Sequence, residues 1–340
     1  ATYGKGFKGT LRGNLQKIEV QAEALFGKTT EFRYWYADAL VAIKSGIPLM
    51  PGLSAYGFGG GYYYKMKQSA EGTAIGRTKS GIFYTPDQST SGIKAMMLIG
   101  TSGKPDPFNG AIALEVIINR NGGINSVSMK GSAQFMAPLS TDPEKVIKEN
   151  ATKAIQTATI DRFSSLVSGQ VFGSVNLQFD NVNDVFHGNL EIYVNVAGGI
   201  VRGVGSGNKA GWATIHFERN DWYILIGTPD QPIGLEVARI FKSKSYIMMG
   251  KNLPGSPPPP EQVSQILGGV DLDYMRDMNA LQSGTGFAFG LQFIVDTGDL
   301  NFLMFYGRFA AGTGLDFMLK DYGNTMQCAE TGSTVGINGW

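Results

Sequence analysis

The stretch Gly286-Phe-Ala-Phe-Gly-Leu-Gln-Phe-Ile-Val-Asp296 decides the fold class, because its large apolar residues recur at every second position. A period of two is the pattern of a β-strand, in which successive side chains point to opposite faces. Thr297-Gly-Asp299 then supplies turn residues, and we expect the return strand over Leu300–Phe309. That return strand carries apolar residues on both faces, which predicts that another layer covers it.

Short alternating or apolar stretches bounded by glycine, asparagine and aspartate fill most of the remaining chain. They predict a mainly β protein, built as one large antiparallel sheet system in the form of an extended sheet, a sandwich or a solenoid. Two stretches do not have the pattern of a β-strand. Asp142-Pro-Glu-Lys resembles the start of a helix, and Pro257-Pro-Pro-Pro260 favours an extended segment before a second helix.

These signals divide the chain without producing a clean domain boundary. We expect antiparallel β regions at residues 1–140, 170–250 and 284–340, a helical insertion at residues 141–169, and a proline-rich strap with a short helix at residues 251–283. One continuous architecture is the simplest topology for these regions.

An internal repeat supports the hairpin interpretation. Leu114–Ile124 and Leu190–Ile200 match at Leu, Glu, Asn, Gly, Gly and Ile with the same spacing. Each repeat predicts a strand that ends in a Gly-Gly turn, where a positive φ costs little. The match is explained either by duplication of a hairpin or by convergence on a good hairpin sequence.

Composition excludes several classes of protein. With 43% apolar residues and a net charge of +1, the chain can offset its conformational entropy and offers no general attraction to nucleic acid. The single cysteine, Cys328, cannot form an internal disulfide, and no His/Cys cluster suggests a metal. No apolar run has the length of a membrane-spanning helix. Both ends look like interrupted strand, so we expect a segment of a longer polypeptide.

We predict no catalytic residue, metal or cofactor. Asp296-Thr-Gly298 resembles the turn of aspartic proteases, but that chemistry needs two such carboxylates and the chain has one such motif. The preferred interpretation is a hairpin turn. His187 and His216 lack a neighbouring nucleophile motif, and the scattered acids select no glycosidase-like pair.

Aromatic clusters are the best candidates for binding a ligand or a partner. They lie in Phe32-Arg-Tyr-Trp-Tyr36, in Gly59-Gly-Gly-Tyr-Tyr-Tyr64 and at Trp222-Tyr223, and they combine flat apolar surface with polar tips. Such rings stack on sugars or bury a partner's surface, although most aromatics in β-proteins fill the core or pair across strands. The candidate binding residues are Trp35, Tyr62, Tyr64, Trp222 and Tyr223.

Several phrases carry a family resemblance: residues 32–41, Gly57-Phe-Gly-Gly-Gly-Tyr62, residues 222–230 and Gly255-Ser-Pro-Pro-Pro-Pro-Glu261. In these phrases the chain resembles very large, repetitive, secreted or envelope-associated β-proteins of Bacteroidota-type bacteria. The resemblance implies an extracellular or cell-envelope segment with a structural or adhesive role, and it brings no catalytic residues.

Three functions remain open. The leading one is a non-enzymatic structural or interaction module of a bacterial extracellular or envelope assembly, which acts through sheet edges and aromatic surfaces. The alternatives are an outer-membrane β-barrel and a carbohydrate-binding or carbohydrate-active protein. The expected partners are other protein subunits or neighbouring domains of a longer parent. A glycan and a membrane stay open as partners, and nucleic acid is not expected.

Overall fold

The computed structural model describes residues 6–69, 78, 84–105, 107–135, 171–255, 268–269, 284–302, 305–324, 327 and 331–339. The predicted helical insertion at residues 141–169 lies outside this range, as does most of the predicted strap and helix at residues 251–283. Within the described part, the helical elements are two three-residue 3-10 turns, Ala197–Gly199 and Ser206–Asn208. No helix in that part is long and apolar enough to cross a bilayer.

The fold is antiparallel β, as the sequence predicts. The strands form a 17-stranded antiparallel sheet and a separate two-stranded ribbon. The chain divides into two compact units, Ala1–Phe186 (unit 1) and His187–Trp340 (unit 2), and each is described by itself.

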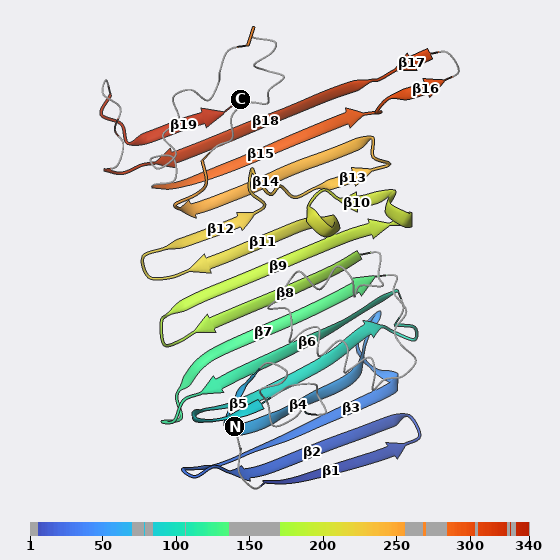
Figure 1. Cartoon of the computed structure of the whole chain (residues 1–340), viewed down its shortest axis with the longest axis vertical. Coiled ribbons are helices and arrows are strands. Elements are labelled where there is room, and N and C mark those ends of the chain that lie inside the picture. The colour runs from blue at the N-terminus through green and yellow to red at the C-terminus, as the bar shows by residue number, and fades with distance from the viewer. Residues whose placement is uncertain are drawn as a thin grey trace. The chain divides into compact units, whose positions relative to one another are not determined.

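Unit 1 is a meander in which each strand pairs with the next along the chain (Figure 1). Its strands are β1 (Gly6–Leu15), β2 (Ile18–Lys28), β3 (Arg33–Met50), β4 (Leu53–Gln68), β5 (Tyr84–Thr101), β6 (Phe108–Ile118), β7 (Ile124–Phe135) and β8 (Val171–Asp180). Short connections of this kind are what antiparallel neighbours permit.

Unit 2 combines a similar meander with shorter strands. Its strands are β9 (Val185–Val196, which begins at the unit boundary), β10 (Val201–Gly203), β11 (Lys209–Phe217), β12 (Trp222–Ile226), β13 (Leu235–Val237), β14 (Phe241–Lys251), β15 (Thr285–Asp296), β18 (Ala310–Asp321) and β19 (Val335–Gly339). β14, β15, β18 and β19 pair in that order (Figure 1). β12 and β13 both pair with β14.

The strand that decides the fold class is found where the sequence predicts it, but its return strand is not. β15 pairs along its whole length with β18, so the return strand is Ala310–Asp321 and not residues 300–309. The intervening residues form the separate ribbon of β16 (Leu300–Phe302) and β17 (Phe305–Gly307). The apolar residues of this segment pair locally as a hairpin extension, and this is why their pattern read as a strand.

The repeated sequence forms two turns that depend on glycine. In the first repeat, Asn119 accepts backbone hydrogen bonds from Asn121 and Gly123 at 2.9 Å, and Gly122 has φ +84°. In the second repeat, Gly198 and Gly199 have φ +66° and +92°. Both turns reverse the chain between antiparallel strands, which confirms the predicted role of the Gly-Gly pair.

Candidate functional site: an exposed apolar face and a buried face with charged side chains

One face of unit 1 is apolar and exposed. The strand registers place its residues together. This apolar face comprises Phe7, Leu11, Leu15, Val20, Ala22, Ala24, Phe26, Trp35, Ala37, Ala39, Val41, Phe58, Tyr62, Tyr64, Ile93, Ala95, Met97, Ile112, Leu114, Val116, Val127, Met129, Leu177 and Phe179. Phe7 is 83% exposed and Leu11 66%. In the described registers of β1 to β8, the ionisable residues on this face are Lys28, Arg33 and, beyond a bulge in β4, Lys67, which forms an ion pair with Asp87.

The opposite face of unit 1, called here the buried face, has the reverse character. Glu23 is 4% exposed, Asp38 5% and Lys94 6%, and they lie beside buried tyrosines and leucines. Soluble proteins almost never bury such side chains fully unless they are paired. Unit 1 therefore covers three charged side chains on one face, beside its buried apolar residues, and leaves large apolar side chains such as Phe26 and Leu114 exposed on the other.

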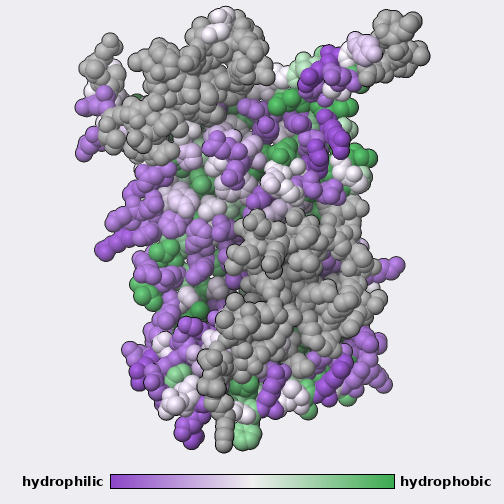
Figure 2. All heavy atoms as spheres, viewed as in Figure 1, coloured by the Kyte–Doolittle hydropathy of each residue, from purple (hydrophilic) through white to green (hydrophobic). Residues whose placement is uncertain are grey.

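Unit 2 shows the same polarity. Phe293, Leu319 and Ile337 are exposed and share one face of β15, β18 and β19, whereas Asp316 and Lys320 on the other face are buried. Figure 2 shows hydrophobic side chains at the surface among hydrophilic ones. Because the two units repeat the arrangement, it does not depend on one local sequence.

Three of the predicted binding residues meet on the apolar face of unit 1. The ring centroids of Trp35 and Tyr62 are 5.1 Å apart, and those of Trp35 and Tyr64 are 6.3 Å apart. Phe26, which the sequence analysis did not select, stacks on Trp35 at 6.1 Å. We call these four residues the aromatic cluster. Its members lie near one end of β2, β3 and β4, and sugar stacking by them stays a prediction.

The other two predicted residues do not join this cluster. Trp222 and Tyr223 are consecutive on β12, so they point to opposite faces of the strand. Trp222 stacks on Phe217 with ring planes 9° apart, and Tyr223 stacks on His216 with centroids 5.0 Å apart. The pair is therefore not one binding surface, and Trp222 alone lies on the apolar face of unit 2.

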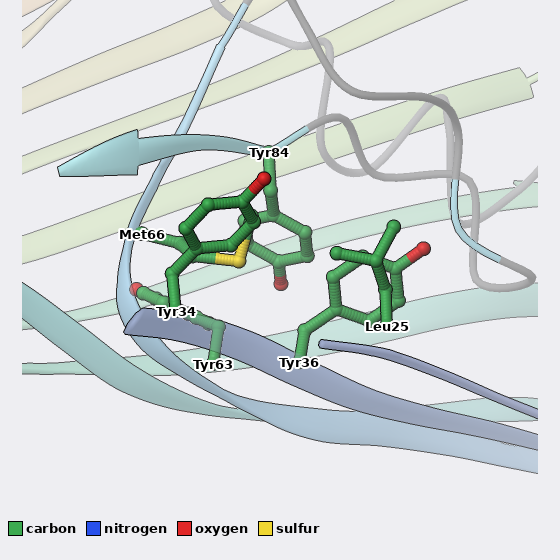
Figure 3. Packing of buried hydrophobic residues seen from close by; sticks show 6 residues of the cluster. All are labelled: Leu25, Tyr34, Tyr36, Tyr63, Met66 and Tyr84. Atoms are coloured by element: carbon green, nitrogen blue, oxygen red, sulfur yellow. The ribbon is translucent and has the colours of Figure 1, made fainter. Parts of the chain in front are cut away.

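A network of tyrosines and carboxylates lies on the buried face of unit 1. Tyr36 donates a hydrogen bond to Glu23, and Tyr63 donates one to Glu115 at 2.8 Å. Tyr84 points toward both phenol rings, with centroids 5.6 Å from Tyr36 and 4.8 Å from Tyr63 (Figure 3).

Lysines complete this network. Lys8 Nζ lies 3.0 Å from Glu23 Oε1, and Lys94 Nζ lies 3.8 Å from Glu115 Oε1. Glu23 and Glu115 thus each have a phenol and an ammonium partner, which is what makes their burial tolerable.

Tyrosine and glycine face each other across strands in both units. Tyr63 is directly opposite Gly92, and Tyr246 is directly opposite Gly290. A Cβ at either glycine would overlap the tyrosine side chain. The phenol lies across the glycine and reaches a carboxylate on the following strand, Glu115 in unit 1 and Asp316 in unit 2.

Asp296, the residue that resembles a protease motif, serves a turn. It accepts a hydrogen bond from the Gly298 backbone N–H at 2.9 Å, and Arg308 donates to both of its carboxylate oxygens. The hydrogen bond from Arg308 and then that from Gly298 lower the pKa of Asp296 to about 2. This carboxylate is held as an anion in an exposed turn, as the hairpin interpretation predicts.

Among the described residues, no group of three or more His, Cys, Asp or Glu side chains is arranged to hold a metal ion. Comparison with known proteins gives no match to a family model, to a curated protein or to a solved structure.

Proposed function

We propose that this chain is a structural protein of the bacterial cell envelope whose apolar faces contact the hydrocarbon of a lipid bilayer. The observation that carries the proposal is the apolar face of each unit, which leaves Phe26, Leu114 and Phe293 exposed while Glu23 and Lys320 are buried on the opposite faces. A half-solvated sheet of a soluble protein turns its polar side chains to water and its apolar ones to the core. Membrane strands turn apolar side chains to lipid and polar ones away from it.

Strand length supports the same conclusion. β1, β2, β6, β7 and β8 have 10 to 12 residues each, and so do β14, β15 and β18. A tilted strand needs about 9–11 residues to cross the hydrocarbon core. Aromatic side chains border the apolar face of unit 1 at both ends, with Trp35 and Tyr62 at one end and the Phe108–Phe135 pair at the other. Aromatic girdles at the two interfaces are typical of membrane strands.

A groove on the apolar face suits acyl chains better than a second folded surface. Small residues of neighbouring strands, including Gly9, Ala24 and Ala37, line a shallow groove of about 580 Å³ between Leu11 and Tyr62. Flexible hydrocarbon chains fill an irregular apolar surface without the close complementarity that protein interfaces require.

Folding in the presence and absence of lipid tests the proposal. The urea-unfolded chain is diluted into buffer, or into phosphatidylcholine vesicles that are then floated on a density gradient. We expect β circular dichroism, flotation and protection from protease with vesicles only. A folded, monodisperse protein in lipid-free buffer would overturn the proposal. A folded homo-oligomer there would favour burial of the apolar face against a second copy.

Pairing of the β1 edge is the second candidate function, because β1 pairs only with β2 in the described registers. The other edge of β1 has backbone groups that a bilayer cannot satisfy, so we propose that a strand of a neighbouring domain or subunit pairs there. Slow hydrogen exchange at alternate β1 amides in the assembled protein is expected. Fast exchange along the whole strand would contradict the pairing.

A further inference from the structure

Two cations face each other at the end of the apolar face of unit 1. Lys28 of β2 is directly opposite Arg33 of β3, and both are exposed. Like charges directly opposite on neighbouring strands repel and destabilise the pair. In the described part of the chain, neither cation forms an ion pair with a carboxylate. Their repulsion is relieved when an anion lies between them.

The aromatic cluster adjoins this pair. Phe26 and Trp35 each lie two residues from one of the cations on the same strand and face. A third cation, Lys65, has its Nζ 5.4 Å from the ring centroid of Tyr64. Tryptophan and tyrosine are enriched where hydrocarbon meets headgroups. The turn between β2 and β3 also carries Glu31, so this end of the sheet combines interfacial rings with a net positive charge from Lys28, Arg33 and Lys65.

We infer that Lys28 and Arg33 bind the phosphate of an anionic lipid headgroup, while the aromatic cluster lies at the level of the membrane interface. The inference rests on the proposed function, because it needs the apolar face in the bilayer. Arginine presents a planar fork that matches phosphate oxygens, and lysine adds a mobile point charge. Each lysine or arginine near an anionic membrane surface raises the affinity for that surface by about fivefold.

Trp35 is a built-in reporter for this site. In a variant with Trp212, Trp222 and Trp340 changed to Phe, Trp35 is the remaining tryptophan, and brominated lipids quench it on contact. Quenching by brominated phosphatidylglycerol and by brominated phosphatidylcholine in mixed vesicles gives their relative affinity at the site. We expect about a fivefold preference or more for phosphatidylglycerol. Lys28→Gln with Arg33→Gln should abolish it.

The control variant removes two positive charges from a different part of unit 1. Lys17→Gln with Lys104→Gln changes two exposed turn lysines at the other end of the strands, and the preference sensed by Trp35 should persist.

The other possible results contradict either the headgroup site or the proposed function. A preference that survives loss of Lys28 and Arg33, or equal quenching by both lipids, overturns the headgroup site. Either result leaves the proposed function standing, because quenching itself shows lipid at Trp35. Loss of the preference in excess inorganic phosphate would instead assign a free-phosphate site. Absence of quenching by any lipid would overturn the proposed function.

Discussion

Tyr63 and Tyr246 have the same role in the two units. Each donates a hydrogen bond to a carboxylate that has little contact with water. Each phenol crosses a glycine on the neighbouring strand and hydrogen-bonds to an acid on the next one, Glu115 or Asp316. The glycine is required for its lack of a side chain, since neither Gly92 nor Gly290 has a positive φ. The hydrogen bond to each of these carboxylates thus requires a glycine on the strand between the tyrosine and the acid.

Replacement of Gly92 by alanine should destabilise unit 1. The new Cβ would overlap the Tyr63 hydroxyl and approach the Val116 carbonyl oxygen at 2.8 Å. Overpacking of this kind costs about 1–3 kcal/mol, and urea unfolding in lipid vesicles measures it. The matched control is Gly13→Ala, where nothing lies within 4 Å of the new Cβ. Because alanine stabilises an extended strand by about 0.5–1 kcal/mol relative to glycine, Gly13→Ala should not destabilise the protein. Equal effects of the two substitutions would contradict the close contact between Tyr63 and Gly92.

The hydrogen bond between Tyr63 and Glu115 should show direct energetic coupling. Tyr63→Phe removes the donor from a carboxylate at 2.8 Å and should cost about 1–3 kcal/mol. Glu115→Gln alone should also destabilise, because it removes the partner of Lys94. In the double variant the costs should fall short of their sum by about 0.5–3 kcal/mol. Strict additivity in the unfolding free energies would show that the two groups act independently.

At the scale of the element, alternation along β2 predicts which face each side chain takes. Ile18-Glu-Val-Gln-Ala-Glu-Ala24 alternates apolar and polar residues without interruption. In the structure Ile18 is exposed and the next three apolar residues are half-buried, whereas Gln21 and Glu23 are buried. The period was therefore readable from the sequence. The side that meets solvent was not, because alternation is identical for a strand facing water and for one facing lipid.

Pairing partners explain the other differences between sequence and structure. The Gly-Gly turns and the parity of β15 are local properties, so they could be predicted. The return strand was misplaced because a short local hairpin, β16 and β17, has the same composition as a long strand. The proximity of Trp35 to Tyr62 depends on the register of β3 with β4. The link from Tyr63 to Glu115 spans 52 residues of sequence, which no motif signals.

Arginine placed on β6 and on β7 should reveal the depth of each position in the proposed bilayer. Leu114, near the middle of the strand, is 41% exposed, and Ile124, at the start of β7, is 48% exposed. Leu114→Arg should cost about 2–4 kcal/mol of folding free energy in vesicles, and Ile124→Arg about 0–1 kcal/mol. In a sheet whose face meets water, both exposed sites should stay within about 0.5 kcal/mol of the parent chain. Urea titration in vesicles distinguishes the two.

At the scale of the whole molecule, the two units present one physical pattern built from different residues. Unit 1 buries Glu23 and Lys94, unit 2 buries Asp316 and Lys320, and each leaves a phenylalanine of its apolar face, Phe26 or Phe293, exposed. Composition conceals this pattern, because 17% charged residues and a net charge of +1 do not say which face carries them. In the proposed bilayer, the exposed apolar faces of both units would contact hydrocarbon, and the buried charges would stay on the opposite faces.

Collision accessibility of spin labels along β6 shows whether the apolar face of unit 1 contacts lipid. Single cysteines are introduced in turn from residue 111 to residue 117 in a Cys328→Ser background, and the labelled protein is folded into vesicles. We expect labels at 112, 114 and 116 to collide with membrane-dissolved oxygen and to be shielded from a water-soluble nickel complex. Labels at 113 and 115 should show the reverse, or low accessibility to both. Nickel accessibility at 112, 114 and 116 equal to that of an exposed turn would contradict it.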